Sequence, residues 1–170
     1  VAMFEYLLKN DKVPVEFVAA QLSYANSSAD KELLPLMEQA LYKASAENTK
    51  VQETFRLALE RMPSRVFVYA MNDKQRVCFS QLFSKVNPAE RTNIVIPGFS
   101  RATWGGTANE IRYFRASDQP RATEIAATFS NVGLRFKATD LSSQEAGVQR
   151  NRPNTFELWF GSEPLPASCG

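Results

Sequence analysis

The chain contains no histidine. This absence excludes Ser–His–Asp and Cys–His catalysis, imidazole general bases and nearly every ligand set of the zinc hydrolases. Paired carboxylates, lysines and tyrosines could still act as catalytic groups, so the absence disfavours an enzyme without excluding one. We therefore predict no catalytic residue.

Cysteine is scarce, with only Cys78 and Cys169 in the chain. Cys78 lies among apolar residues of a predicted helix, and Cys169 lies one residue from the end of a proline-containing tail. Two cysteines placed so differently indicate neither a disulfide framework nor the spacing of metal ligands. We expect Cys78 to be a small buried apolar residue, and we expect no metal and no cofactor. A cytoplasmic and a periplasmic (bacterial envelope) location both fit this composition.

Long apolar runs are also absent. No stretch approaches the roughly 20 apolar residues that a membrane-spanning helix needs, and no basic-then-apolar signal segment opens the chain. We expect no membrane insertion. The hydrophobic fraction of 44% and the charged fraction of 22% are ordinary for a globular protein. Because the chain begins at Val1 within a helix-like pattern, we expect a fragment of a larger multidomain protein.

The net charge of +2 is unevenly distributed. Residues 1–63 carry seven Lys and Arg against nine Asp and Glu, whereas residues 64–170 carry thirteen against nine, and ten of those thirteen are Arg. Arginine presents a planar fork to carboxylates and phosphates and stacks on aromatic rings. The arginine-rich part is therefore either an ordinary solvated surface or a contact surface for an anionic partner.

Residues 1–63 have the spacing of helices. Apolar residues recur every three or four positions over residues 33–44 and again over residues 51–62, which is the period of an amphipathic helix. Pro63 closes this segment, since proline interrupts a helix. We expect the apolar stripes to pack into a core.

One pattern occurs twice in the remainder of the chain. Arg65–Arg76 and Glu110–Arg121 each begin with an apolar and aromatic run, reach an Asp eight residues later, and have an Arg three residues beyond. A helix-like segment follows each copy, and then a second strand-like run, Asn93–Ile96 or Arg135–Thr139. Two strand–helix–strand units in tandem predict a βαββαβ order, and Thr155–Phe160 adds a last strand.

The predicted fold class is therefore α+β. A helical segment (residues 1–63) precedes a ferredoxin-like βαββαβ sandwich with an extra C-terminal strand (residues 64–161), and a tail follows (residues 162–170). In such a sandwich both helices cover one face of the sheet. The alternation of side chains assigns these residues to the other face: Phe67, Tyr69, Arg112, Phe114 and Trp159.

Several uses of that second face are open. The N-terminal helices could cover it, another protein or a second copy of the chain could bind it, or nucleic-acid bases or sugars could stack on its rings. A catalytic cleft built on carboxylates such as Asp140, Glu145 and Glu157 is a further alternative.

The repeated Asp-x-x-Arg spacing has two interpretations. Asp73 (or its neighbour Asn72) and Asp118 are expected to cap helices, which places Arg76 and Arg121 in the first turn, where the helix macrodipole disfavours a cation. Each Arg could pair with its own Asp. Alternatively, an anion could be held between the helix start and the Arg.

The candidate binding residues are mostly arginines of the second half of the chain. Some belong to the long connection of residues 98–109 or to the polar stretch of residues 140–154, and connections of this kind often carry binding residues. We predict a contact surface formed by Arg101, Trp104, Arg112, Arg115, Arg121, Arg150 and Arg152.

The second copy of the pattern resembles a known module. Ile111-Arg-Tyr-Phe, the spacing of Ala122, Ile125, Phe129 and Val132, and Arg135-Phe-Lys resemble the C-terminal module of LytR-type cell-envelope proteins and, more loosely, the SPOR domain. The resemblance covers residues 110–141, about a fifth of the chain. Phe114–Asp118 stands where the LytR-type pattern has Asn-Gly and an internal Gly, so no binding residue is carried over. The resemblance implies a βαββαβ binding module and a bacterial envelope context.

Together these observations predict a non-catalytic binding or regulatory module that acts through protein–protein contacts, either with a partner or by self-association. The alternative is a module that binds an anionic polymer, such as the glycan strand of peptidoglycan or a nucleic acid. Binding to a nucleic acid would weaken steeply with salt, because neutralising phosphates releases counterions.

Overall fold

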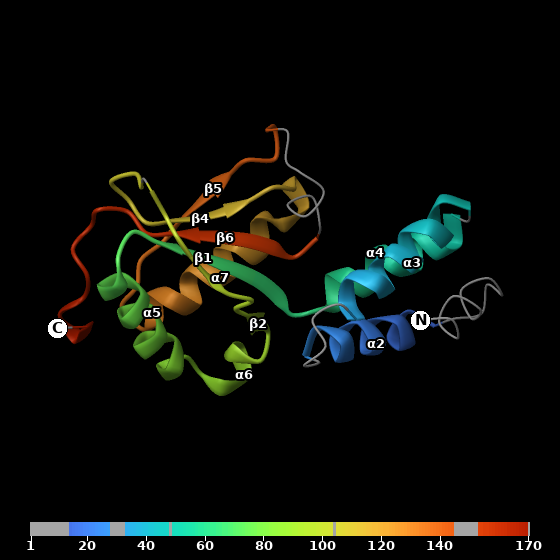
Figure 1. Cartoon of the computed structure of the whole chain (residues 1–170), viewed down its shortest axis with the longest axis horizontal. Coiled ribbons are helices and arrows are strands. Elements are labelled where there is room, and N and C mark those ends of the chain that lie inside the picture. Colours follow the sequence, from blue (N-terminus) through green and yellow to red (C-terminus); the bar gives the residue numbers. More distant parts are fainter. Residues whose placement is uncertain (1–13, 28–32, 48, 104, 145–152, 170) are drawn as a thin grey trace. The chain divides into compact units, whose positions relative to one another are not determined.

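The computed structural model describes residues 14–27, 33–47, 49–103, 105–144 and 153–169 (Figure 1). The chain divides into two compact units, Val1–Met62 and Pro63–Gly170. Each unit is described by itself. Within the described ranges, no helix has both the length and the apolar character needed to cross a membrane.

The first unit is a group of helices that pack on one another. It contains α2 (Val15–Ser27), α3 (Leu33–Glu47) and α4 (Thr49–Arg61). The helical character predicted for residues 1–63 is confirmed over these three ranges, and residues 1–13 lie outside the described residues. Apolar side chains from all three helices and from the residue after α4 form one buried core: Val18, Leu22, Ala25, Met37, Ala40, Leu41, Val51, Ala58, Leu59 and Met62.

The second unit is built on one mixed sheet of six strands. The strands are β1 (Ser64–Ala70), β2 (Ile94–Val95), β3 (Phe99–Arg101), β4 (Glu110–Tyr113), β5 (Lys137–Asp140) and β6 (Thr155–Trp159). Their order is β2-β1-β6-β4-β5, and β3 pairs with β1 along the edge that β2 also uses. β1 is parallel to β2, β3 and β6, whereas β4 is antiparallel to β6 and parallel to β5.

Two helices cover one face of this sheet (Figure 1). α5 (Asp73–Lys85) joins β1 to β2 through the short α6 (Pro88–Arg91), and α7 (Gln119–Asn131) joins β4 to β5. The two crossovers run in opposite directions, because β4 is antiparallel to β6 and β6 is parallel to β1. A right-handed connection in each therefore brings both helices to the same side.

Phenylalanines form the centre of the core under these helices. Phe79 of α5 and Phe129 of α7 are fully buried, with ring centroids 5.3 Å apart. Phe160, which follows β6, meets the ring of Phe79 edge-on at 6.4 Å. The inward positions of β1, β4 and β6 complete the core: Val66, Val68, Ala70, Ile111, Tyr113, Phe156 and Leu158.

The mixed α and β character predicted from the sequence is confirmed, but a ferredoxin-like strand order is not. In a split βαβ sandwich, a strand of one unit lies between the two strands of the other. Here β1 and β2 are direct neighbours, as are β4 and β5, and β6 lies between the two pairs. The strand predicted as a C-terminal addition therefore occupies the centre of the sheet. Four of its five residues are buried, which fits that position.

β3 was not predicted, because residues 98–109 carry no clear strand pattern. With three residues, all exposed, β3 is too short and too accessible to show an alternation of apolar and polar side chains. Pro97 and Gly98 separate it from β2. These two residues interrupt what would otherwise be one long edge strand paired with β1.

The expectation that the cysteines are unlinked is wrong, because Cys78 and Cys169 form a disulfide with Cα atoms 5.1 Å apart. The bond joins α5 to the short helical turn η2 (Ala167–Cys169). Leu165 also packs against the core, so residues expected to form a separate tail are held to the sheet unit. The two cysteines are separated by 91 positions in the sequence, and only the fold brings them together.

Replacing Phe129 with alanine should lower the free energy of unfolding of the second unit by about 3–5 kcal/mol, because it leaves a cavity among fully buried rings. Urea denaturation followed by tryptophan fluorescence measures the change. Ser130→Ala, at an exposed position one residue on, is the matched control and should change little. An equally small effect of Phe129→Ala would contradict the packing of α7.

The double variant Cys78→Ala, Cys169→Ala should lower the free energy of unfolding by about 4 kcal/mol, because the disulfide closes a long loop in the unfolded chain. Urea denaturation with and without dithiothreitol measures it. Dithiothreitol should destabilise the natural chain and leave the variant unchanged. If the natural chain carries two thiols by mass spectrometry and keeps its stability, the disulfide does not contribute as expected.

Candidate functional site

A cleft lies at one edge of the sheet, where several strands end and a helix begins. β1, β3 and β6 are mutually parallel, so their carboxyl ends meet at this edge, the usual position of ligand sites in parallel sheets. The cleft has a volume of about 350 Å³. Its lining comes from the end of β1, the start of α5 and β3: Ala70, Asn72, Asp73, Arg76, Phe99, Ser100 and Arg101. We call it the carboxyl-end cleft.

Polar side chains fix the start of α5 at this edge. The Asn72 side chain caps the helix by accepting a hydrogen bond from the backbone N–H of Gln75 at 3.0 Å. The buried Gln75 side chain accepts from the N–H of Met71 at 2.8 Å and donates to the carbonyl of Gly161 at 2.9 Å. Gln75 thus links the start of α5 to the ends of β1 and β6, so the walls of the cleft are held in place.

Two arginines face the cleft, and they differ in how they are engaged. Arg76 pairs with Asp73 at 3.2 Å, but the two side chains are 54% and 90% exposed, so water screens the pair and it contributes little. Arg101 is exposed, and its guanidinium has no hydrogen bond or ion pair with any described residue. The cleft therefore carries two arginines against one aspartate.

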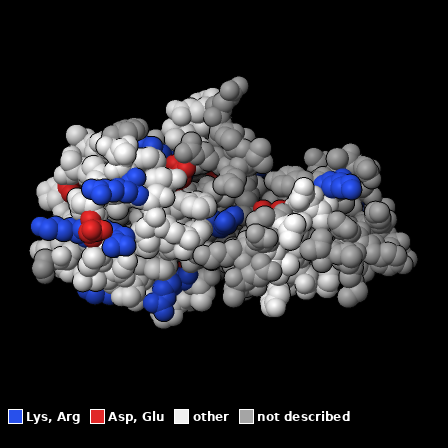
Figure 2. All heavy atoms as spheres, viewed as in Figure 1, with Lys and Arg blue, Asp and Glu red and all other residues white. Residues whose placement is uncertain are grey.

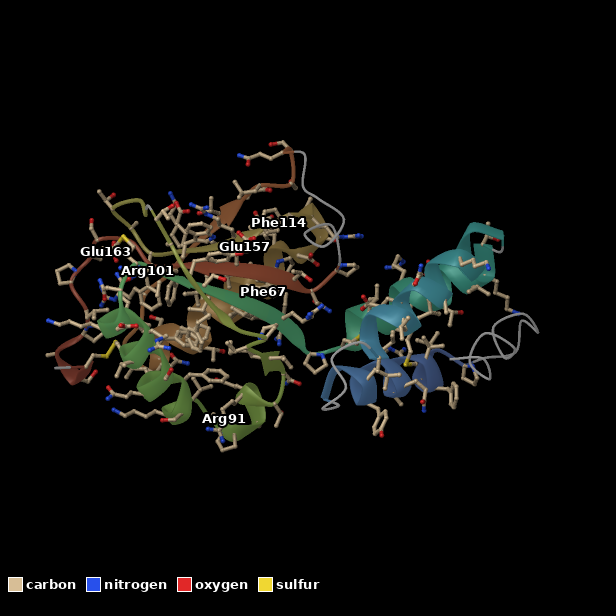
Figure 3. The ribbon with its side chains drawn as sticks, viewed as in Figure 1. Phe67, Arg91, Arg101, Phe114, Glu157 and Glu163 are labelled. Carbon is tan, nitrogen blue, oxygen red and sulfur yellow. A yellow bond between two sulfur atoms is a disulfide. The ribbon has the colours of Figure 1, made fainter. Side chains whose placement is uncertain are left out.

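These charged groups share the lining of one cleft. Figure 3 shows Arg101 at the end of the sheet where α5 begins. In Figure 2, basic side chains surround an acidic one on this side of the second unit. An anionic group would therefore be attracted to the cleft.

Phe99 gives the cleft an apolar wall. One side of its ring packs edge-on against Phe79 of the core, with centroids 5.7 Å apart. The side chain remains 41% exposed, which makes it one of the few large apolar groups at the surface of the described second unit. The cleft thus combines a cationic and an apolar surface.

The second face of the sheet, opposite the helices, carries a compact aromatic cluster. Tyr69 stacks on Trp159 with ring centroids 4.3 Å apart and planes 6° apart. The guanidinium of Arg112 lies over the Trp159 ring at 4.4 Å and pairs with Glu110 at 2.8 Å. Since β6 lies between β1 and β4, Tyr69 and Arg112 approach the Trp159 ring from opposite sides. Both faces of this indole are occupied.

Glu157 lies within the same cluster. It is 4% exposed and accepts a hydrogen bond from the indole N–H of Trp159 at 3.0 Å. Its neighbours across the sheet are Phe67 of β1 and Arg112 of β4, and Figure 3 shows Phe67 and Glu157 side by side. Phe114, also assigned to this face, lies just beyond β4 and is buried. The contacts within the cluster make it a structural feature of the sheet.

Arg121 also has a structural role. Its guanidinium donates to the Ser64 hydroxyl at 2.8 Å and to the carbonyl of Asn93 at 3.0 Å, and it pairs with Glu124 at 2.8 Å. It joins the start of α7 to the starts of β1 and β2. The pairing of Arg121 with Asp118 that the spacing suggested is wrong, because Arg121 pairs with Glu124 instead. The Asp118 carboxylate is buried and accepts a hydrogen bond from the backbone N–H of Asn154 at 3.5 Å. The two Asp-x-x-Arg copies therefore differ.

The predicted binding residues do not form one surface. Arg101 lines the carboxyl-end cleft, Arg112 lies on the second face, Arg115 precedes the turn η1 (Ala116–Asp118), and Arg121 faces the opposite edge. Trp104, Arg150 and Arg152 lie outside the described residues. Phe99 and Ser100 of the cleft were not singled out from the sequence, whereas Asn72 and Arg76 were considered only as part of a possible anion position at the start of a helix. The available signal for the site was the first Asp-x-x-Arg copy, which directly follows a parallel strand.

The carboxylates considered for catalysis are not brought together. Asp140 is in register with Tyr113, which faces the helices, whereas Glu157 is in register with Arg112 on the second face. The two carboxylates thus belong to opposite faces of the sheet, and Glu145 lies outside the described residues. The described part of the chain contains no acidic or cysteine cluster able to hold a metal ion.

Two titratable groups of the second unit have shifted pKa values. Burial raises the pKa of the Tyr113 phenol, and hydrogen bonds from Ser142 lower the pKa of the Asp140 carboxyl. Both groups belong to the β4–β5 side of the sheet. Neither Tyr113 nor Asp140 lines the carboxyl-end cleft.

Comparison with protein-family models, with curated proteins and with solved structures finds no match to the chain. The site is therefore interpreted from its own geometry.

Arg121→Ala should lower the free energy of unfolding by about 1–3 kcal/mol, because it removes charge-assisted hydrogen bonds that join α7 to β1 and β2. Arg121→Lys should restore little, since an ammonium cannot reproduce the planar fork. Urea denaturation measures both variants. Unchanged stability in both would show that Arg121 is not a structural clamp and would restore it as a binding candidate.

Proposed function

We propose that the chain is a non-catalytic binding module that acts through protein–protein contacts. The carboxyl-end cleft is the contact site, and it receives an acidic side chain of the partner. The observation that carries this proposal is Arg101, an exposed arginine with no described partner, beside Arg76 and the exposed ring of Phe99. Arginine and aromatic side chains are enriched at protein interfaces, where they supply much of the binding energy.

The second face of the sheet supports a protein partner over a nucleic acid or a glycan. Modules that bind single strands combine a basic groove with rings on which bases stack. Tyr69 and Arg112 already occupy the two sides of the Trp159 ring, so stacking on it would require breaking these contacts. The cleft holds two arginines, which suits one or two carboxylates better than a long polyanion.

The disulfide favours one of the two compartments left open by the sequence. Bonds such as Cys78–Cys169 persist in secreted and periplasmic proteins and are rare in the cytosol of most organisms. Together with the resemblance of residues 110–141 to LytR-type modules, the bond supports a role in the bacterial envelope. We propose an oxidising compartment for this binding module.

The proposal predicts which peptides the chain selects. From a library of random peptides displayed on phage, the immobilised chain should enrich sequences rich in Asp and Glu. Arg76→Ala and Arg101→Ala should each weaken a selected peptide by about tenfold, because each removes a charge-assisted hydrogen bond. Fluorescence anisotropy measures the affinities. Arg135→Ala is the matched control, since Arg135 is exposed, lies outside the cleft and changes the net charge equally.

Three results would oppose the proposal. Selected peptides without acidic residues would contradict the charge of the site. Equal losses in Arg101→Ala and Arg135→Ala would show a general electrostatic effect instead of a site. Tighter binding of oligothymidylate than of any peptide, lost at high salt, would establish the anionic-polymer alternative.

A further inference from the structure

The outer edge of β3 has backbone groups that β1 does not use. The N–H of Val68 donates to the carbonyl of Gly98 at 3.4 Å, and the N–H of Ala102 donates to the carbonyl of Ala70 at 2.9 Å. In a parallel ladder, alternate residues of a strand bond to one neighbour while those between point the other way. The residues bonded to β1 are therefore Gly98, Ser100 and Ala102. The N–H and C=O groups of Phe99 and Arg101 point away from the sheet.

No described residue bonds to these outward groups. β2 pairs with β1 at Ser64 and Arg65, whereas β3 pairs with it farther along, so β2 does not cover the outer edge of β3. All three residues of β3 are exposed. The edge thus offers two N–H and two C=O groups, with the two residues about 7 Å apart as in any strand.

The residues with outward backbone groups also line the carboxyl-end cleft. Phe99 and Arg101 are in register with Val68 and Ala70, whose side chains lie on the helix-covered face, so their own side chains lie on that face too. Ser100, between them, has the opposite orientation. An added strand beside β3 would therefore place every second side chain next to Phe99, Arg101 and Arg76.

We propose that the edge of β3 and the carboxyl-end cleft form one site for an extended acidic peptide, which adds to the sheet as a further strand. Its backbone pairs with Phe99 and Arg101. Its alternate side chains place carboxylates on Arg101 and Arg76 and an apolar group on Phe99. This inference rests on the proposed function and specifies its partner.

The chemistry of the edge favours a polypeptide. Alternating N–H and C=O groups at strand spacing pair with an extended backbone that carries the same groups at the same spacing, which is the basis of β-strand addition. Nucleic acids and glycan strands lack that alternation. The two arginines add charge complementarity, and the pairing of Arg76 with the exposed Asp73 is weak enough for a competing carboxylate to displace.

The test uses the full chain labelled with ¹⁵N and a synthetic Glu–Val peptide of about eight residues, blocked at both ends, whose alternate residues are Val, Glu, Glu and Val with Thr between them, so that one face carries both the carboxylates and the apolar groups. Amide exchange measured by NMR should slow at least tenfold at Phe99 and Arg101 when the peptide binds. The N–H of Ser100, which faces β1, is the internal control and should change little. Two further peptides carry N-methyl groups on alternate backbone nitrogens, one on the odd-numbered residues and one on the even-numbered residues. Only one of them should lose binding, because only one set of N–H groups faces β3 and the other set faces solvent.

The outcomes separate this inference from the proposed function. Binding that depends on Arg101 and Arg76 without protection of the two amides, and with equal tolerance of both methylated peptides, overturns strand addition and leaves the acidic-peptide site. No binding of the Glu–Val peptide, or equal binding of its Gln–Val counterpart, overturns the inference. If the display selection also enriches no acidic peptide, the proposed function fails with it.

Discussion

The position of β6 between β1 and β4 is the constraint on which the second unit depends. β6 is parallel to β1 and antiparallel to β4, so it joins two strand–helix–strand units that run in opposite directions into one sheet. Phe156 and Leu158 point from it into the core under both helices. Its end is equally constrained, because a Cβ at Gly161 would lie 2.5 Å from the carbonyl oxygens of Thr107 and Ala108. Glycine alone allows this close approach.

The opposite directions of the two units explain why similar local sequences have different roles. α5 begins at the edge where β1, β3 and β6 end, and an exposed edge strand lies beside it. Arg76 is therefore left at the rim of an open cleft. α7 begins at the other edge, against the starts of β1 and β2, where Ser64 and Asn93 accept hydrogen bonds from Arg121. The same first-turn arginine is a surface charge in one unit and a clamp in the other.

The second face of the sheet and the β3 edge also differ in how far their polar and aromatic groups are engaged. On the second face, Tyr69, Trp159, Arg112 and Glu110 satisfy one another, and this leaves the indole no open side. At the β3 edge, backbone groups, an arginine and part of a phenylalanine ring face outward. Composition alone makes the aromatic face the more obvious binding surface. The contacts favour the edge, because among the described residues the ion pair that binding there would break, Arg76 with Asp73, is weak and screened by solvent.

Much of the architecture follows from local sequence patterns. Alternation identifies β1 and β6, helical spacing identifies α5 and α7, and the two faces assigned to the side chains of β1 and β6 are read correctly. These features depend on residues a few positions apart, so the amino-acid sequence is enough to establish them. Arg101 was also recognised as a candidate binding residue from its place in a long connection.

The strand order, the disulfide and the exposure of individual arginines depend on contacts between distant segments of the chain. The central position of β6, the pairing of β3 with β1 and the Cys78–Cys169 bond all join residues far apart in the chain. Whether an arginine is exposed, as Arg101 is, or held by hydrogen bonds, as Arg121 is, depends on which strands lie beside it. No periodicity encodes those neighbours, because hydrogen bonding between strands is set by how the whole chain folds back on itself.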